Sequence, residues 1–308
     1  MTHTFPSHWA ALPDVVSELY AQRRSPPATF AAPADRARAL DSLRDPRVVE
    51  GVAMIAIRGP LTKYARYSPL GMMDYEAAIR AAADRPDVNS LLLVIESPGG
   101  TVDGTPRLAG VVAQVAKRKP VVAYADGLMA SAAYWIGSQA SAIVASPFAI
   151  VGSIGTLLVH TDFSVMLDRA GIKVTMLTAP ASTQKTEGNP YESLSKDFVA
   201  RMKSELGRAN DAFISGVRSR RPGLGADAFT GAAWMAESAP RGLIDRIGEI
   251  ESAIFTALQL AVQAGTYGVG RPPAPAAALA TRAPESQRAA EAFVRHRELF
   301  AMRPRGGM

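Results

Sequence analysis

The sequence contains no cysteine and only four histidines among its 308 residues. The lack of cysteine excludes disulfide scaffolds, thiolate metal sites and cysteine proteases. It has no His-x-x-x-His pair and its carboxylates are scattered, so we predict neither a metal nor another cofactor. No apolar stretch is long enough to span a bilayer, and the first residues lack the apolar run of a signal peptide. We therefore expect no membrane anchor and a cytoplasmic location.

The net charge is small outside the C-terminal segment of the chain. Of the net charge of +6, the segment 265–308 supplies +4, from seven arginines and three glutamates. The remaining core is nearly neutral, and we predict that it binds no nucleic acid. From Arg271 the composition becomes rich in proline and alanine, which predicts a disordered tail because such a segment buries too little apolar surface to fold.

Short apolar runs alternate with helical segments through the middle of the chain. The predicted strands are 52–61, 91–96, 121–125, 142–145 and 174–178. The predicted helices are 75–83, 107–117, 131–139, 162–170, 194–218 and 250–262. This alternation predicts an α/β fold with a mostly parallel sheet and repeated βαβ units.

The same pattern divides the chain into three regions. We predict an N-terminal arm over 1–48, a core over 49–264 and an Ala/Pro/Arg-rich tail over 265–308. Two helices are expected in the arm, over 9–23 and 33–43, and the arm packs either on the core or on a neighbouring molecule.

Ser131 lies where a predicted buried strand, 121–125, passes into a predicted helix, 131–139. The positive end of the helix dipole stabilises negative charge near its hydroxyl. Taken alone, Ser131 is either a helix N-cap or a nucleophile, and caps are far more common.

Three other motifs follow strands or lie in nearby loops. Gly99 and Gly100 follow the strand 91–96, and a glycine pair there exposes backbone N–H groups that suit an oxyanion hole. Ser153 stands between two glycines after another apolar run, and Lys185 lies in a polar loop. Binding sites of parallel sheets gather at the carboxyl ends of the strands, where both glycines and both serines are expected.

The motifs together resemble the signal peptide peptidase A family of serine/lysine proteases. They are Ser-Pro-Gly-Gly at 97–100, Ala-Ser-Ala-Ala-Tyr at 130–134, Gly-Ser-Ile-Gly at 152–155 and Lys-x-x-Gly-Asn-Pro at 185–190. The resemblance extends over about 51–248. It implies a crotonase/Clp-like fold, a Ser-Lys dyad and a ring- or dome-shaped homo-oligomer whose active sites are completed by neighbouring chains.

The resemblance also implies a role for individual residues. Ser131 is the nucleophile, Lys185 the general base and Ser153 the hydroxyl that orients the lysine. The oxyanion N–H groups come from Gly99, Gly100 and Ala132. The chain departs from the family at Ala132-Ala133, where two glycines usually follow the nucleophile.

Two alternatives compete with this chemistry. His160, followed by Asp162, is a candidate base for a Ser-His-Asp triad, since Clp proteases share the fold and use a histidine in this part of the sequence. Crotonase relatives use paired oxyanion N–H groups without Ser131 or Lys185, so an acyl-CoA enzyme or an inactive scaffold is the second functional hypothesis.

The resemblance favours a serine endopeptidase acting on a protein or peptide substrate. Family members without anchors occur in tailed-phage genomes as prohead proteases, and their tails can be rich in alanine, proline and arginine. We therefore predict a phage head maturation protease with capsid and scaffold proteins as partners. A soluble cellular peptidase of the same family is the alternative.

Overall fold

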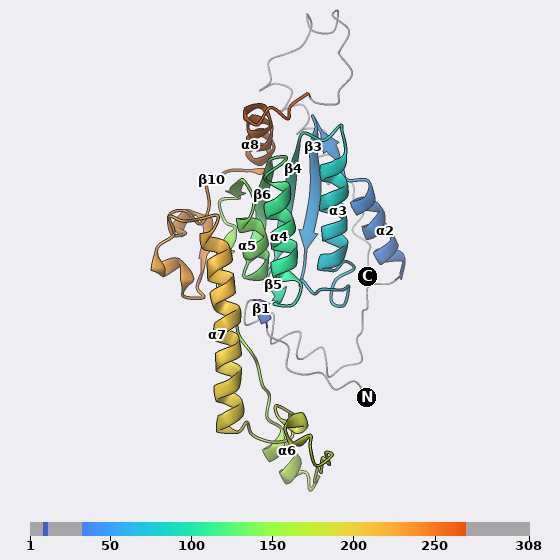
Figure 1. Ribbon diagram of the computed structural model, residues 1–308, viewed down its shortest axis with the longest axis vertical. Helices are drawn as coiled ribbons and strands as arrows, with labels where there is room; N and C mark the ends of the chain where they lie inside the picture. The colour runs from blue at the N-terminus through green and yellow to red at the C-terminus, as the bar shows by residue number, and fades with distance from the viewer. Residues whose placement is uncertain (1–8, 12–32, 269–308) are drawn as a thin grey trace, which may run out of the picture.

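The computed structural model describes residues 9–11 and 33–268. Within that part, strands and helices build one central sheet with helices packed on it (Figure 1). The strands of the sheet are β2 (Val48–Val49), β3 (Val52–Arg58), β4 (Ser90–Ser97), β6 (Val121–Ala130), β7 (Ala142–Ala145), β8 (Ile150–Gly152), β9 (Ala233–Met235) and β10 (Arg246–Ile247). The helices packed on it are α3 (Met72–Asp84), α4 (Thr105–Val115), α5 (Ala132–Ser138) and α8 (Ile250–Gln263).

Parallel pairing dominates the sheet. Its order is β10-β7-β6-β4-β3-β2, and β8 and β9 continue beside the end of β6. All pairs are parallel except β2 with β3 and β8 with β9. Helices connect β3 to β4, β4 to β6 and β6 to β7, each a parallel pair. The predicted α/β class with repeated βαβ units is confirmed.

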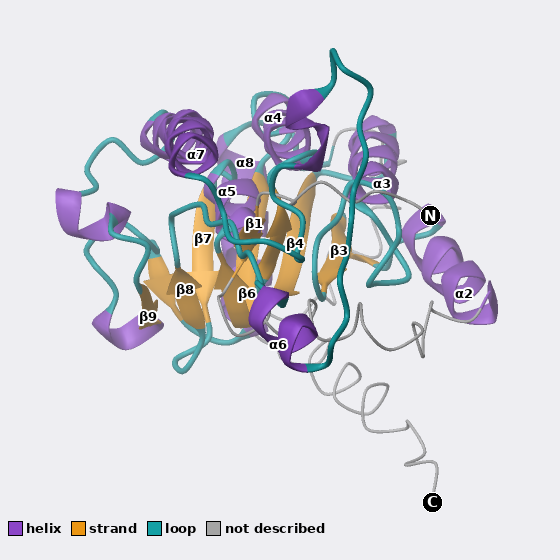
Figure 2. Ribbon diagram, turned by 90° about the horizontal axis from the view of Figure 1, so that it is seen from below, coloured by secondary structure: helices purple, strands orange, loops and turns teal. Residues whose placement is uncertain are grey.

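Alternate residues of the strands face two separate cores. Leu93 and Ala123 pack in the core that contains α3, α4 and α5. Leu92 and Val122 point the other way and pack with Ala253 and Ala257 of α8. Figure 2 shows α3 and α4 side by side along one face of the sheet. The strands therefore read as continuous apolar runs because they are buried on both faces.

β6 changes its neighbour part-way along its length. Tyr124 and Ala125 pair with β7, whereas residues 128–130 pair with β8. Gly127, with φ +93°, lies at the change. Glycine adopts this left-handed backbone without steric cost. The register between β4 and β6 also shifts between Ile95 and Ser97.

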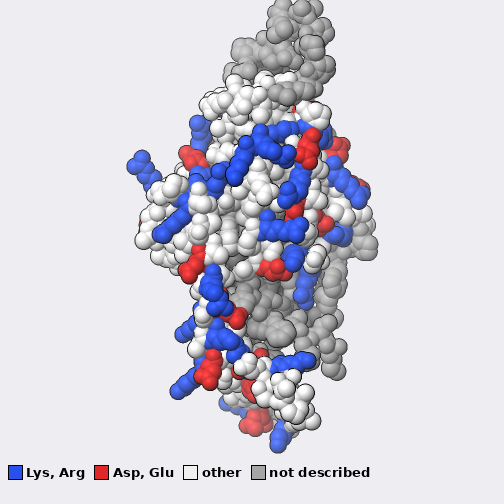
Figure 3. Space-filling view, viewed as in Figure 1, with Lys and Arg blue, Asp and Glu red and all other residues white. Residues whose placement is uncertain are grey.

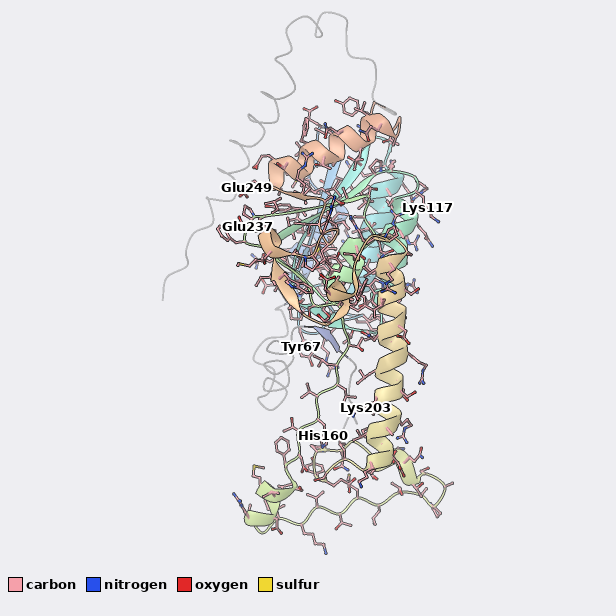
Figure 4. All side chains as sticks on the ribbon, turned by 90° about the vertical axis from the view of Figure 1, so that its left-hand side faces the viewer. Tyr67, Lys117, His160, Lys203, Glu237 and Glu249 are labelled. Atoms are coloured by element: carbon pink, nitrogen blue, oxygen red, sulfur yellow. The ribbon has the colours of Figure 1, made fainter. Side chains whose placement is uncertain are left out.

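A long excursion leaves the sheet after β8. It covers residues 156–195, contains α6 (Ser164–Arg169), and returns along α7 (Lys196–Arg218). Figures 1 and 4 show α7 projecting beyond the sheet, with α6 near its far end. Figure 3 shows side chains of both charges mixed along α7 and the excursion.

The predicted strand over 174–178 is wrong. These residues form no strand, and Leu177 is 91% exposed. Residues 174–178 have the apolar pattern of a strand, but the segment projects away from the sheet. A β-rich sequence becomes a strand only with a partner strand beside it.

The N-terminal region contains one confirmed and one incorrect prediction. Helix α2 (Pro33–Arg44) lies where a helix was predicted. Trp9–Ala11 form strand β1, not the start of a helix, and pair with β5 (Gly99–Thr101). The predicted disordered tail lies outside the described residues from 269 onward. The proposed boundaries of arm, core and tail stay predictions.

Candidate active site

Ser131 occupies a strained junction between β6 and α5. Its backbone angles are φ 54° and ψ −121°. Within the described residues, only Glu50, Ser131 and Ser153 combine a positive φ with a side chain. Such a conformation costs of order 1–3 kcal/mol and gathers at functional sites. Two of the three strained positions are the serines that the sequence motifs single out.

The hydroxyl of Ser131 is buried without a hydrogen-bond partner. The residue is 0% exposed, and its Oγ makes no hydrogen bond to the described residues. Its side chain does not cap α5, although its backbone carbonyl accepts a bond from Trp135 N–H at 2.9 Å. An unsatisfied buried hydroxyl costs about 1–3 kcal/mol. These features disfavour the N-cap interpretation and are typical of a nucleophile at a sharp strand-to-helix turn.

The register of the sheet brings Ser153 beside Ser131. Ala130 at the end of β6 pairs with Gly152 at the end of β8, so the two serines follow neighbouring strand ends. The Ser131 N–H donates to the Gly152 carbonyl at 2.7 Å, and the Ser153 N–H donates to the Ala232 carbonyl at 2.7 Å. Ser153 is 5% exposed. The predicted proximity of the two serines is therefore present in one chain.

Ser153 also lines an open cleft. The cleft has a volume of about 380 Å³ and lies between the 153–157 loop, the middle of α7 and the 229–231 turn. Its lining includes the polar side chains of Asn210 and Thr230. Gly207 faces it from α7, and a side chain there would meet no atom within 4 Å. The cleft has room for a side chain that enters from outside this chain.

The glycine pair is held tightly by its neighbours. Ser97 Oγ donates to the Gly59 carbonyl at 2.7 Å and accepts the Gly99 N–H at 3.2 Å. Gly99 has φ +99°, and a Cβ on Gly100 would lie 1.7 Å from the Leu61 carbonyl oxygen. The N–H of Gly99 is therefore occupied in this structure. Among the predicted oxyanion groups, the N–H of Gly100 points to the opposite edge of β5.

Ala132 is the third predicted oxyanion residue. It is 0% exposed and is the first residue of α5, directly after Ser131. The first N–H groups of a helix have no partner within the helix. The N–H of Ala132 therefore has the position that an oxyanion donor next to the nucleophile requires.

Lys185 lies far from this cluster in the same chain. It belongs to the short helical turn η1 (Thr183–Thr186), and its side chain is exposed. The loop around it is fixed to the start of α7, where Glu187 pairs with Arg201 and Gly188 packs against Phe198.

The opposite end of α7 docks on the site. Phe213 stacks on Trp135 of α5 with ring centroids 4.7 Å apart. The helix between Phe198 and Phe213 is about 22 Å long at 1.5 Å per residue. The chain therefore brings Ser131 and Ser153 together but leaves Lys185 on the order of 20 Å away, beyond the reach of a lysine side chain.

His160, the competing base, also lies on the excursion. Figure 4 shows it beside the projecting part of α7, away from the sheet. Its neighbour Asp162 accepts hydrogen bonds from Ser164 and Ser193. The bond from Ser164 is the main cause that lowers the Asp162 pKa to about 2. Asp162 therefore fixes the turn before α6, and no Ser131–His160–Asp162 triad forms within this chain.

Sequence comparison assigns the family. The model of peptidase family S49 matches residues 113–264. Residues 113–264 belong to peptidase family S49. This segment contains Ser131, Ser153 and Lys185, and the resemblance predicted from the motifs is confirmed.

Two phage proteins are among the relatives of this chain. It is 31% identical over 181 residues to the capsid assembly protease C of Escherichia phage lambda, covering 56% of this chain and 40% of that protein. It is 30% identical over 232 residues to the head-tail preconnector protein GP5 of Enterobacteria phage P21, covering 71% and 46%. The chain spans about half the length of the curated relatives it matches.

Solved structures give a more distant match. The 1510-N membrane-bound stomatin-specific protease, in a mutant form, is 16% identical and covers 69% of this chain and 84% of that chain, with a TM-score of 0.39. A TM-score this low supports no detailed correspondence.

The described residues contain neither a membrane-spanning helix nor a metal-binding cluster. Among residues 9–11 and 33–268, no helix combines the length and apolar composition needed to cross a membrane. The same residues hold no group of three or more His, Asp or Glu side chains placed to bind a metal ion.

Two features of the site were not predicted from the sequence. One is the role of Ser97, whose hydroxyl connects Gly59 to Gly99. The Ser-Pro-Gly-Gly motif contained that signal, because a serine before a glycine turn commonly bonds nearby backbone groups. The other feature is the pairing of β1 with Gly99–Thr101. It could not be predicted because a strand of three residues is too short to show a periodic pattern.

Proposed function

We propose that this S49 chain is a serine endopeptidase with Ser131 as its nucleophile. The observation that carries the proposal is the strained, buried and unpartnered Ser131 hydroxyl beside Ser153 at neighbouring strand ends. The positive φ of Ser131 lowers the stability of the folded protein. Such strained residues are typical of sites where function requires them. An acyl-CoA enzyme that uses only oxyanion N–H groups has no need for such a serine.

The general base in this proposal is Lys185 from a neighbouring copy of the chain. Lys185 is too far from Ser131 in its own chain, whereas the cleft at Ser153 is open to solvent. A lysine accepts a proton only as the neutral amine, and burial favours that form. Entry of the neighbour's Lys185 into the cleft would bury it beside Ser153, whose hydroxyl would orient it.

The exposed surface of the excursion supports such an assembly. Several large apolar side chains are exposed there, namely Val165 at 62%, Met166 at 57%, Ile172 at 53%, Leu177 at 91% and Tyr191 at 45%. No residue of α6 is buried. A group of large apolar side chains exposed on one segment is typical of an interaction site. We propose that a second copy covers it in a ring- or dome-shaped homo-oligomer.

The reaction follows from these groups. Ser131 Oγ attacks the peptide carbonyl while Lys185 takes its proton, and the N–H of Ala132 receives the oxyanion. Collapse of the intermediate transfers the proton from Lys185 to the leaving amine and forms an acyl-Ser131 ester. Water then attacks the ester carbonyl while Lys185 accepts its proton, and Lys185 returns that proton to Ser131 Oγ as the bond between the acyl carbon and Oγ breaks. Gly99 contributes by holding the turn, since its N–H is bound to Ser97.

The proposed substrates are proteins of a phage head. The support is the similarity of the chain to two phage proteins, a capsid assembly protease and a head-tail preconnector protein. Scaffold and capsid proteins are therefore the proposed partners, and a cellular peptidase function is the alternative. Incubating the protein with the capsid and scaffold proteins encoded beside its gene, and mapping any cleavage, separates the two.

The catalytic test uses three single variants. Ser131→Ala and Lys185→Ala should each lose several orders of magnitude in peptide cleavage, because members of one catalytic unit fail together. His160→Ala is the matched control on the same excursion and should keep most of the activity. A serine-reactive fluorophosphonate should label the parent but not Ser131→Ala. An active Lys185→Ala beside a dead His160→Ala would show that histidine is the base.

A further inference from the structure

The outer edge of β5 carries a strand from the N-terminal region of the chain. β1 pairs antiparallel with β5, with Trp9 opposite Thr101, Ala10 opposite Gly100 and Ala11 opposite Gly99. Figure 1 shows β1 next to β5 at the lower end of the sheet, separate from the rest of the described N-terminal region. These two short strands form a sheet of their own.

The hydrogen bonds of β5 define what this edge offers. On the inner side, the Leu61 N–H donates to the Gly99 carbonyl and the Thr101 N–H donates to the Leu61 carbonyl, both at 2.8 Å. Backbone groups alternate sides along a strand, so the N–H and C=O of Gly100 both point to the outer edge. Ala10 lies opposite Gly100, and this pair therefore exchanges both hydrogen bonds.

The edge lies next to the proposed nucleophile. Gly99 follows Ser97 by two residues, and Ser97 pairs with Met129, two residues before Ser131. β5 also packs against α5, which begins directly after Ser131. A strand paired with β5 thus passes close to the catalytic cluster, and β1 runs with Ala11 toward Gly99.

We propose that Trp9–Ala11 occupy the edge of β5 on which an extended peptide substrate binds, and that they compete with the substrate for it. This inference rests on the proposed peptidase function and adds an internal competitor to it. An extended peptide docks on a sheet edge through main-chain hydrogen bonds, and Gly100 supplies both a donor and an acceptor there. While β1 is in place those two groups are already used.

Competition has a measurable consequence. The apparent dissociation constant of an added peptide equals its intrinsic value divided by the fraction of molecules whose edge is uncovered. Removing the hydrogen bond that the Ala10 N–H donates to the Gly100 carbonyl should raise that fraction. One ladder bond makes this an increase of about two- to twelvefold.

The test measures binding to full-length protein that carries Ser131→Ala, so that no cleavage interferes. The probe is a fluorescent peptide with the sequence of residues 7–14, Ser-His-Trp-Ala-Ala-Leu-Pro-Asp. Ala10→Pro removes the N–H that faces Gly100. Ala11→Pro is the matched control, because the N–H of Ala11 points away from β5. Ala10→Pro should bind the probe about two- to twelvefold more tightly than the parent, and Ala11→Pro should bind like the parent.

Hydrogen exchange provides a second readout. The Gly100 amide should exchange faster in Ala10→Pro than in the parent or in Ala11→Pro, and added probe should slow it again. Equal probe affinity in all three proteins, or no binding by any of them, overturns the inference. If Ala10→Pro tightens binding while protein with Ser131 intact cleaves nothing, the peptidase proposal fails and the assignment of the edge stands.

Discussion

Replacing Gly100 by alanine tests the close backbone approach that aligns β5 with the catalytic cluster. The new Cβ would lie 1.7 Å from the Leu61 carbonyl oxygen, and real Cβ atoms essentially never come within 3.0 Å of such an atom. Leu61 and β5 must therefore separate by about 1.3 Å, which breaks the contact between them. Overpacking of this kind costs about 1–3 kcal/mol. Weakening the two Leu61 hydrogen bonds adds about 0.5–1.5 kcal/mol each.

The expected total is a loss of about 2–6 kcal/mol in the free energy of unfolding. Gly110→Ala is the matched control, because that glycine lies within α4 and a side chain there meets no atom within 4 Å. It should gain about 0.5–1 kcal/mol from helix propensity. Urea unfolding followed by circular dichroism measures both variants, and peptide cleavage should fall only in Gly100→Ala. If Gly100→Ala were as stable as the parent, the tight packing of β5 on Leu61 would be wrong.

Three further substitutions test separate parts of the structure. Ser131→Gly should be about 1–3 kcal/mol more stable than Ser131→Ala, since glycine relieves the positive φ; equal melting temperatures would contradict the strain. Tyr134→Phe should cost about 1–3 kcal/mol in urea unfolding because the Leu243 carbonyl loses its 2.9 Å donor; a neutral change would refute that bond. The pKa of Glu76 lies below its ordinary value of 4.5, chiefly through the hydrogen bond from Arg107. This stabilisation is complete above 4.5 and is lost as the pH falls through the lowered pKa. Glu76→Gln should therefore reduce the loss of stability at acid pH. An unchanged acid side of the stability–pH curve would show that Glu76 does not contribute to that loss.

The strands of the core could be predicted from the sequence because they are buried on both faces. The runs 91–95, 121–125 and 142–145 are apolar without interruption, and β4, β6 and β7 include all three. The motifs also located the neighbouring strand ends that carry Ser131 and Ser153. The apolar runs alone were sufficient to predict these strands, because a strand inside the sheet is buried on both faces whatever its position in the strand order.

The misplaced elements depended on distant parts of the chain. The segment 174–178 has the composition of a strand but projects with the excursion, and Trp9–Ala11 is a strand only because Gly100 leaves an edge open. The separation of Lys185 from Ser131 follows from the length of α7 and from the docking of Phe213 on Trp135. Motif order along the sequence carries no information on whether two motifs meet within one chain or between two.

The central claim is that Ser131 of one chain works with Lys185 of another, and mixing two inactive variants tests it directly. Ser131→Ala and Lys185→Ala protein are each purified, then unfolded and refolded together at equal amounts. If the pair forms between chains, about one quarter of the sites combine an intact serine with an intact lysine, and the mixture regains about that share of parental peptide cleavage. Sedimentation should show the same oligomer in the mixture and in the parent. A mixture that assembles normally and remains inactive would contradict the account.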